Sequence, residues 1–352
     1  MLLPNLALAA LLALPGQSSQ PGGAVGGVVV NASDGETPAG RTEVVLRMQV
    51  GKEVIFLDET TTDERGRYLF QNLRLGTNLT YLPGASRQGV HYPGPRIQLT
   101  AERPDAFARL KVHDAVEQPN PLVVLRHEIE IRPQPGALSV TESMLVDNPT
   151  QSTYIGRPAH DGGEPVTMQL SIPPDFERTT FHEEFFGRRF ALIDRKLVTG
   201  IPWTPGQREL KFTYLLPNAQ KHRIWERPLD LPCSQVRVRI RTDDADAVSC
   251  TLPQKSVQRL DEAYEVVFES NGETLPAAEV IRLELGSLPV PWMTSARWVA
   301  VVALVLLIAG VSFVMLRRRS VARRTREAER PAGHRDPAIP EKQRKSSTRR
   351  AA

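Results

Sequence analysis

Two histidine–carboxylate pairs come nearest to catalytic chemistry in this sequence. His127 and Glu130 form a His-x-x-Glu pair, which zinc peptidases combine with a distant third ligand. His182 is followed by two glutamates, but it lacks the second histidine four residues on that the helical zinc-protease motif requires. The alternation of residues 125–131 predicts a strand, which places His127 and Glu130, three residues apart, on opposite faces. The pairs therefore predict no metal site and no catalytic residue.

Two charged runs also have the composition of binding sites. Residues 243–246 read Asp-Asp-Ala-Asp, but they lack the glycine and the closing glutamate of a calcium loop, so we expect a polar turn. Arg237, Arg239 and Arg241 share one face of a predicted strand. They either bind a polyanion or keep a sheet edge from associating, and we favour the second interpretation. The sequence shows no Gly-x-Ser-x-Gly elbow, phosphate loop or dinucleotide fingerprint, so we expect no cofactor.

The two cysteines, Cys233 and Cys250, are separated by sixteen residues. In an oxidising compartment a disulfide closing this short loop stabilises a fold by about 3 kcal/mol. We expect that disulfide, and the alternative is a pair of unrelated buried thiols.

Two apolar segments lie on either side of the region that holds these residues. Residues 6–14 are apolar, too short to cross a bilayer and followed by small residues, so 1–23 is interpreted as a signal peptide, although no Lys or Arg precedes its apolar core. Residues 298–316 are apolar over nineteen positions, about 28 Å as a helix, which approaches the roughly 30 Å of a hydrocarbon core.

The residues beside the second apolar segment favour a membrane span. Trp292 and Trp298 stand at its outer end, where indoles favour the interface, and Arg317, Arg318 and Arg319 follow it, which favours a cytoplasmic side. We therefore expect one transmembrane helix at 297–317, a periplasmic or extracellular N-terminal region and a disordered basic cytoplasmic tail at 318–352. The expected location is the plasma (inner) membrane.

The charge balance argues against a nucleic-acid partner. The chain has 44 Lys and Arg against 40 Asp and Glu, a net charge of +4. Residues 317–352 hold 13 basic and 4 acidic residues, a net of +9, which leaves 31 basic against 36 acidic residues, a net of −5, for the remainder. The folded part is therefore mildly acidic, whereas nucleic-acid binding requires basic charge on a folded face. Only 8 of the 44 basic residues are Lys, a composition typical of GC-rich bacteria.

Short alternating runs separated by Gly, Pro, Asn and Asp predict an all-β protein. In residues 235–241 the alternation is complete, with Val236, Val238 and Ile240 on one face. We expect tandem β-sandwich domains: one at 24–113, a linker at 114–121, a second β-rich domain at 122–220, and strands at 221–290 that form either a third domain or a continuation of the second.

The first unit carries the most specific pattern. After Thr62, Asp63 can bond the backbone two residues on and Gly66 tolerates positive φ, so a turn is predicted there. Tyr68 and Phe70 then point to one side of a strand and bury a large apolar area.

This pattern resembles the carboxypeptidase regulatory-like domain. The resemblance rests on Gly-x-Val, then Val-x-Leu, then Thr-Asp-x-x-Gly-x-Tyr-x-Phe-x-x-Leu. The residues that match this motif are Gly27, Val29, Val44, Leu46, Thr62, Asp63, Gly66, Tyr68, Phe70 and Leu73. Tyr81 and Tyr92 fit later strands, and the resemblance covers about a quarter of the chain. It implies a transthyretin-like, seven-stranded sandwich, grouped with carbohydrate-binding-like folds, and an accessory module without catalysis.

We expect from these features a non-enzymatic membrane protein that displays β-sandwich domains for binding, for adhesion or as an accessory subunit of an envelope complex. The alternative is carbohydrate binding by the first unit, for which Tyr81 and Tyr92 are the candidate contacts. A third alternative is a hydrolase whose site is assembled from distant residues.

Overall fold

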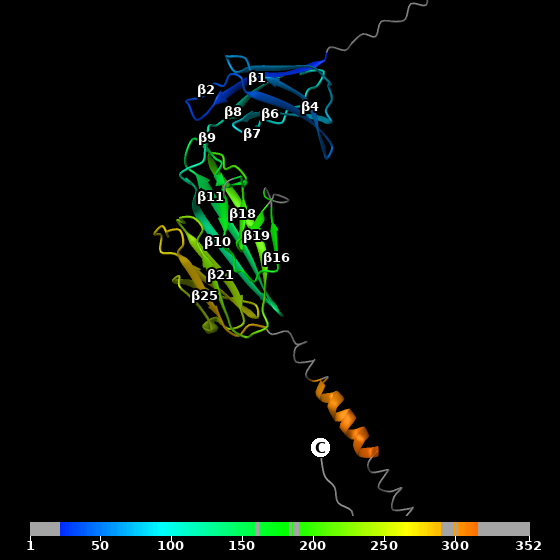
Figure 1. Cartoon of the computed structure of the whole chain (residues 1–352), viewed down its shortest axis with the longest axis vertical. Helices are drawn as coiled ribbons and strands as arrows, with labels where there is room; N and C mark the ends of the chain where they lie inside the picture. The colour runs from blue at the N-terminus through cyan, green and yellow to red at the C-terminus, as the bar shows by residue number, and fades with distance from the viewer. Residues whose placement is uncertain are drawn as a thin grey trace, which may run out of the picture. The chain divides into compact units, whose positions relative to one another are not determined.

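The computed structural model describes residues 22–158, 162–182, 185, 190–289, 299 and 301–315. The chain separates into two units, Met1–Val290 and Pro291–Ala352. Strands make up almost all of the regular structure in the described part of the first unit, so the predicted all-β class is confirmed (Figure 1). Residues 299 and 301–315 are helical and belong to the second unit.

Residues 23–112 form two four-stranded sheets that enclose one apolar core. In the first sheet, β1 pairs antiparallel with β2 and β5 and parallel with β8. Its strands are β1 (Gly23–Asn31), β2 (Thr37–Pro38), β5 (Arg67–Leu73) and β8 (Asp105–Val112). The second sheet has the order β4-β3-β6-β7, with β3 (Glu43–Val50), β4 (Glu53–Thr61), β6 (Leu79–Arg87) and β7 (Val90–Pro93).

The turn predicted before β5 forms as the residue types require. The Asp63 carboxylate accepts hydrogen bonds from the backbone amides of Arg65 and Arg67 at 2.9 and 2.8 Å, and Gly66 has a φ of 74°. Tyr68 and Phe70 then point into the core, where both are buried. The local prediction from this segment is confirmed.

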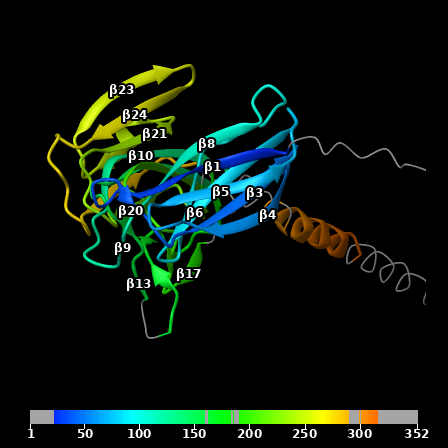
Figure 2. The same cartoon turned by 90° about the horizontal axis from the view of Figure 1, so that it is seen from above.

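Residues 122–289 form a second sandwich whose first layer is a seven-stranded sheet. Its order is β16-β19-β11-β10-β21-β24-β23, and Figure 2 shows β10, β21, β24 and β23 following one another. The strands are β10 (Val123–Gln134), β11 (Ala137–Asn148), β16 (Arg178–Phe181), β19 (Gly206–Pro217), β21 (Val236–Thr242), β23 (Gln254–Leu260) and β24 (Ala263–Glu269). Strands from 122–220 and from 221–290 thus share one sheet and one core, so the two ranges form a single domain.

The second layer of this sandwich is divided into two three-stranded sheets. The β15 sheet has the order β15-β18-β17, with β15 (Met168–Leu170), β17 (Ala191–Ile193) and β18 (Lys196–Thr199). The β20 sheet has the order β20-β25-β22, with β20 (Arg223–Pro228), β22 (Val248–Cys250) and β25 (Val280–Leu285). Side chains of both sheets pack with the seven-stranded sheet in one core. The remaining short elements are β9 (Ala115–Val116), β12 (Thr153–Tyr154), β13 (Arg157–Pro158), β14 (Pro165–Val166) and the 3-10 turn η2 (Ala245–Ala247).

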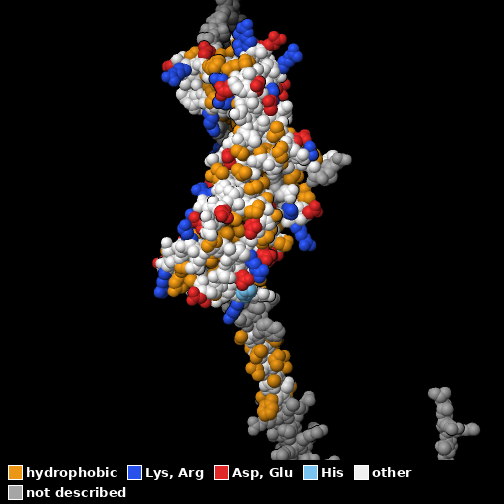
Figure 3. Space-filling model, turned by 90° about the vertical axis from the view of Figure 1, so that its left-hand side faces the viewer, with side chains coloured by type: hydrophobic (Ala, Val, Ile, Leu, Met, Phe, Trp, Pro, Cys, Tyr) orange, Lys and Arg blue, Asp and Glu red, His pale blue; other side chains and the backbone are white. Residues whose placement is uncertain are grey.

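The alternation predicted for β21 is confirmed. Val236, Val238 and Ile240 are fully buried, and Arg237 lies on the other face, where it pairs with Glu269 at 2.9 Å. On the face shown in Figure 3, basic and acidic side chains are interspersed rather than gathered.

The segment expected to be a linker, 114–121, begins with ordered structure. The Asp114 carboxylate accepts hydrogen bonds from Asn31 and Arg87, and β9 pairs in parallel with β12. The peptide groups that follow Asp114 are therefore held by backbone pairing, which the Pro- and Asn-rich composition did not indicate.

The predicted membrane span is wrong. Within the residues that the structure describes, no helix combines the length and the apolar character needed to cross a bilayer. The single-pass location inferred from that span is therefore corrected as well. Trp292, Trp298, Arg317, Arg318 and Arg319 lie outside the described residues, as do 1–21 and 316–352.

Candidate functional site

A charged network lies inside the core of the second sandwich. Glu142 on β11 and Arg227 on β20 are both fully buried, and the Arg227 Nε lies 3.1 Å from each Glu142 carboxylate oxygen. His127 Nε2 on β10 is 2.9 Å from Glu142 Oε2, and the Tyr214 hydroxyl on β19 donates to Oε1 at 2.8 Å. Because the seven-stranded sheet supplies Glu142 and the β20 sheet supplies Arg227, the network links the two layers.

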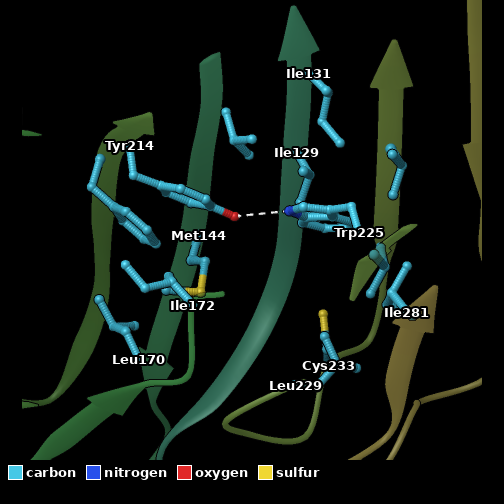
Figure 4. Packing of buried hydrophobic residues seen from close by; sticks show 14 of the residues in the cluster. Ile129, Ile131, Met144, Leu170, Ile172, Tyr214, Trp225, Leu229, Cys233 and Ile281 are labelled. Carbon is cyan, nitrogen blue, oxygen red and sulfur yellow. Dashed lines mark hydrogen bonds between the residues drawn. The ribbon is translucent and has the colours of Figure 1, made fainter. Parts of the chain in front are cut away.

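Apolar and aromatic side chains surround this network. Figure 4 shows the Trp225 indole from β20 reaching the Tyr214 hydroxyl, to which its Nε1 donates at 3.2 Å, with Ile129, Met144 and Leu170 packed nearby. Water is thereby excluded from the carboxylate, so that its partners are protein groups rather than solvent.

The pKa shifts favour the charged forms of Glu142 and Arg227. Burial raises the pKa of the Glu142 carboxyl, but the Arg227 charge and the His127 hydrogen bond outweigh burial, and the pKa lies at about 2. Burial lowers the pKa of Arg227, but the Glu142 and Asp230 carboxylates outweigh it and the net shift is upward. Burial and the neighbouring Glu142 charge raise the pKa of Tyr214 well above its ordinary value. A carboxylate so acidic and so enclosed is a poor general acid or base near neutral pH.

A groove lies between the two sheets of the second layer. One hollow of about 620 Å³ runs along β20 opposite residues 171–175 and the turn before β18. Another, of about 530 Å³, lies between residues 166–171 and 228–231. Ser171, Lys196 and Pro228 line both hollows, so the two hollows adjoin.

The walls of this groove are two sheet edges. In the described part of the chain, β15 pairs only with β18, and β20 pairs only with β25. Arg227 bridges the edges, because its Nη1 lies 3.4 Å from the Ser171 carbonyl oxygen and 2.8 Å from Asp230 Oδ2. Asp230 completes the bridge by accepting the Ser171 amide at 2.9 Å. The buried network thus fixes the spacing between the two edges.

Two kinds of side chain face outward along the groove. Ile224 on β20 is 43% exposed, and Lys196 on β18 is exposed where the two hollows meet. Gln169 is exposed on β15 between the buried Met168 and Leu170. The two edges can hydrogen-bond to the backbone of an extended chain. Ile224 and Lys196 can select its side chains by an apolar and a cationic contact.

The structure does not form the predicted disulfide. Cys233 and Cys250 are free thiols. Cys233 forms backbone bridges with Val124 and Leu275, whereas Cys250 pairs with Leu283 in the β20 sheet, so the two belong to different strand neighbourhoods. Burial raises the pKa of the Cys233 thiol to about 11.

The candidate ligand contacts Tyr81 and Tyr92 are buried rather than displayed. Tyr81 is 1% exposed and its hydroxyl donates to the Arg74 carbonyl oxygen. Tyr92 is 5% exposed and its hydroxyl donates to the His113 carbonyl oxygen. Neither ring can stack on a ligand, because the strands that carry them turn these positions into the core.

The structure separates the His-x-x-Glu pair as the strand period requires. His127 is buried against Glu142, while Glu130, on the opposite face, accepts a hydrogen bond from Arg132. Among the described residues, no group of three His, Cys, Asp or Glu side chains is placed to hold a metal ion. Phe185, three residues after His182, is fully buried.

Glu142 and Arg227 are the residues that the sequence interpretation missed. The signal was present: Glu142 stands at an inward position of an alternating strand, between Val140 and Met144. Arg227 likewise follows Trp225 by two residues on β20. Both residues could have been identified as charged side chains at core-facing positions of an alternating strand.

Comparison with known proteins shows only distant similarity. No family model matches the sequence, and no curated protein matches it. A solved putative protease from Parabacteroides distasonis ATCC 8503 matches 49% of this chain and 41% of its own with a TM-score of 0.33 and 14% identity. An M1 zinc metallopeptidase from Deinococcus radiodurans matches 47% of this chain and 42% of its own, with a TM-score of 0.32 and 11% identity. The chain thus spans less than half the length of either protein, and similarity at this level carries no argument about function.

Proposed function

We propose that the chain is a non-catalytic binding protein, in which residues 122–289 hold an extended segment of a partner protein in the groove between β15 and β20. The observation that carries this proposal is the pair of sheet edges that border one groove without pairing with each other. An added strand would hydrogen-bond to the backbone of an edge, which is a common mode of peptide recognition.

The buried ion pair supports the proposal because it pre-organises the groove. Arg227 and Asp230 tie Ser171, next to β15, to β20 in the absence of any partner. A groove whose walls are already fixed loses little conformational entropy on binding, which favours affinity for a short segment.

The side chains along the groove define the segment. Ile172, Ile224 and Trp225 line the hollow beside β20, so apolar side chains fit there at alternate positions of an extended chain. Lys196 lines both hollows and has no ion pair among the described residues, whereas Asp175 in the same hollow pairs with Arg223 at 2.5 Å. An acidic side chain in the middle of the segment therefore complements the groove.

The chemistry of the core supports a role without catalysis. Its carboxylate is held by Arg227, His127 and Tyr214 rather than directed at a cleft, and no described group of side chains is arranged to hold a metal. General acid–base chemistry often uses a histidine beside a carboxylate in a cleft. The residues that line the two hollows include no histidine.

The test is to select a display library of random linear peptides on the purified chain. We expect selected peptides to carry an acidic residue between apolar positions, and Ile224→Arg or Lys196→Glu to weaken their binding at least about tenfold. The matched control is Val257→Arg on β23, because Val257 is 42% exposed and lies outside the groove. N-methylation of alternate amides in a selected peptide should also weaken binding, since it removes donors to the strand edges.

Two outcomes contradict the proposal. One is a library that yields no peptide above background. The other is a selected peptide that binds Ile224→Arg, Lys196→Glu and the control equally well.

A further inference from the structure

The hairpin of β3 and β4 gives the first sandwich an apolar sheet edge. Among the described residues β4 pairs only with β3, so the other side of β4 is a free edge. Val54, Ile55 and Phe56, three consecutive residues of β4, are 52%, 44% and 59% exposed. Ile55 is the cross-strand partner of the buried Met48, so it lies on the core-facing side of the sheet and is nevertheless exposed. The sandwich is therefore uncovered along this edge.

The hairpin turn determines which backbone groups face the free edge. Val50 pairs with Glu53 across the two-residue loop Gly51-Lys52, and Gly51 has a φ of 61°, as such tight turns require. The turn hydrogen bond joins the two closing residues, and bonded positions alternate along an antiparallel pair. The backbone of Glu53 and Ile55 therefore faces β3, whereas the N–H and C=O groups of Val54 and Phe56 face the free edge.

A β-bulge limits how far another strand can pair with this edge. Leu57 has no partner on β3, because Arg47 pairs with Phe56 and Leu46 already pairs with Asp58. Just beyond the bulge, the Glu59 amide donates to the Asp58 carboxylate at 2.9 Å and is thus satisfied within the protein. Bulges protect sheet edges from association. Here the bulge protects the far half of β4 and leaves Val54 and Phe56 open.

A second copy of the same edge matches the backbone pattern. When two β4 strands run antiparallel about a two-fold axis at Ile55, Val54 of one copy lies opposite Phe56 of the other. Both residues have edge-facing backbone groups, so each such pair exchanges both of its N–H···O bonds. The two Ile55 side chains meet at the axis, and Val54 against Phe56 is a favourable pair of a β-branched and an aromatic residue.

The charges at the ends of the apolar run select the same arrangement. A two-fold axis at Ile55 brings Lys52 of each copy to Asp58 of the other. Both residues are exposed, and neither has an ion pair within the described part of the chain. An axis at Phe56 would instead set Glu53 against Glu59, which is a repulsive pair. The charge pattern therefore complements a second copy in one register.

The terminal strand of the other sandwich lacks this complementarity. β23 also ends a sheet and carries Val257 and Leu260, each 42% exposed. A two-fold axis at Val257 would set Lys255 against Arg259, and like charges on an edge oppose association. Exposed apolar residues alone thus do not distinguish β4 from β23, but the order of the charges does.

We propose that two copies of the chain pair antiparallel through residues 52–58, with a two-fold axis at Ile55, and so join their β3–β4 sheets into one. The two-fold axis closes the contact, so that the assembly stops at a dimer. The paired segment is short beside the roughly 20–30 residues that each partner contributes to a standard interface, so we expect a weak dimer. This edge belongs to residues 23–112 and is independent of the groove between β15 and β20.

The first test is sedimentation velocity of the full chain from about 1 μM to about 1 mM, the range in which weak dimers form. Lys52→Asp and Asp58→Lys should each weaken dimerisation at least about tenfold, because each sets like charges against each other at both ends. An equal mixture of the two variants should dimerise again, since each supplies the charge that the other lacks. Restoration in the mixture also shows that both variants are folded. Glu59→Lys, beyond the bulge, is the matched control and should dimerise normally.

The second test reads the register directly. Directly opposite residues at the axis have Cα atoms about 4.5 Å apart, which is within the range of a disulfide. Ile55→Cys should therefore link two copies under mild oxidation. Phe56→Cys should not, because Phe56 lies diagonal to its own copy at about 7–8 Å. Peptide mass spectrometry separates this link from any that involves Cys233 or Cys250.

The groove variant Ile224→Arg should dimerise normally, which keeps these tests separate from the peptide experiment. A chain that stays monomeric at about 1 mM would overturn the proposal. So would open-ended aggregates, a mixture that does not restore the dimer, or linking of Phe56→Cys as readily as Ile55→Cys. Flotation of the monomer with lipid vesicles that Phe56→Ala abolishes would instead assign the edge to a membrane surface. Linking of Ile55→Cys to a peptide selected on the chain would assign it to a different protein.

Discussion

The Nε of Arg227 lies 3.1 Å from both carboxylate oxygens of Glu142, and neither side chain is exposed to solvent. The pair joins β20 to β11 across the sandwich and places the guanidinium beneath the groove. Burying two charges is costly, but removing Glu142 alone is worse because it leaves the buried Arg227 with Asp230 as its one carboxylate partner among the described residues. The pair therefore acts as a fixed strut whose loss should affect both stability and the spacing of the groove.

Glu142→Gln should lower the free energy of unfolding by about 3–5 kcal/mol, because Arg227 then stays buried beside a neutral amide. Chemical denaturation of the two proteins measures the difference. Glu226→Gln is the control, since Glu226 pairs at 3.7 Å with Arg282 and both side chains are about half exposed, so its loss should cost less than about 1 kcal/mol. Replacing both partners, as Glu142→Leu with Arg227→Met, should cost less than Glu142→Gln alone. A Glu142→Gln cost as small as the control's would contradict the strut.

The same carboxyl should make stability depend on pH under acid conditions. Its pKa is about 2 in the folded state and near the ordinary 4.5 when unfolded. Its contribution is therefore present above about pH 4.5 and is lost as the pH falls towards 2, and the pKa difference corresponds to about 3 kcal/mol. Denaturation curves between pH 2 and pH 6 should show a shallower slope for Glu142→Gln than for the natural chain. Parallel pH profiles would show that Glu142 is not the group responsible.

Tyr92→Phe should loosen the start of the segment after the first sandwich. The Tyr92 hydroxyl lies 2.9 Å from Thr153 Oγ1 and 3.0 Å from the His113 carbonyl oxygen, and Thr153 is fully buried. Removing the hydroxyl leaves a buried polar group without a partner, which costs about 1–3 kcal/mol. Hydrogen exchange of the β9 and β12 amides should quicken. Tyr264→Phe, in β24, is the comparison, and a change there of the same size would mean that the effect is not specific.

The two thiols should remain unlinked in purified protein. Cys233 is buried, and burial raises the pKa of both cysteine thiols. Alkylation at pH 8 should therefore be slow for the folded chain and should reach both cysteines after denaturation without a reductant. Mass spectrometry of peptides from non-reduced protein gives the reading. A peptide pair linked through Cys233 and Cys250 would restore the disulfide predicted from the sequence.

The period-two alternation of the sequence was sufficient for the strands and for their inward faces. It placed Val236, Val238 and Ile240 in the core and Arg237 opposite them, as the structure does. It also separated His127 from Glu130 correctly. Local chemistry worked where a single turn decides the geometry, as at Asp63 and Gly66.

Tertiary pairing could not be derived in the same way. The burial of Tyr81 and Tyr92 depends on strands from distant parts of the chain, and so does the separation of the cysteines. The groove requires that β15 and β20 end up on one layer, which no local pattern encodes. The apolar residues 298–316 predicted a span from composition alone, but only 301–315 form a continuous described helix.

The central parallel pairing of β10 with β21 has a consequence for how the protein is made. His127 pairs with Val236, which lies 236 − 127 = 109 residues later in the chain. Once β10, β11, β16 and β19 have left the ribosome, they can pair antiparallel as four of the seven strands of this sheet. The edge of β10 that later binds β21 is still unpaired at that stage. The closing of so long a loop is slow, and unpaired edges attract other chains during that interval. Nascent chains stalled between residues 217 and 236 should therefore be the form most dependent on chaperones.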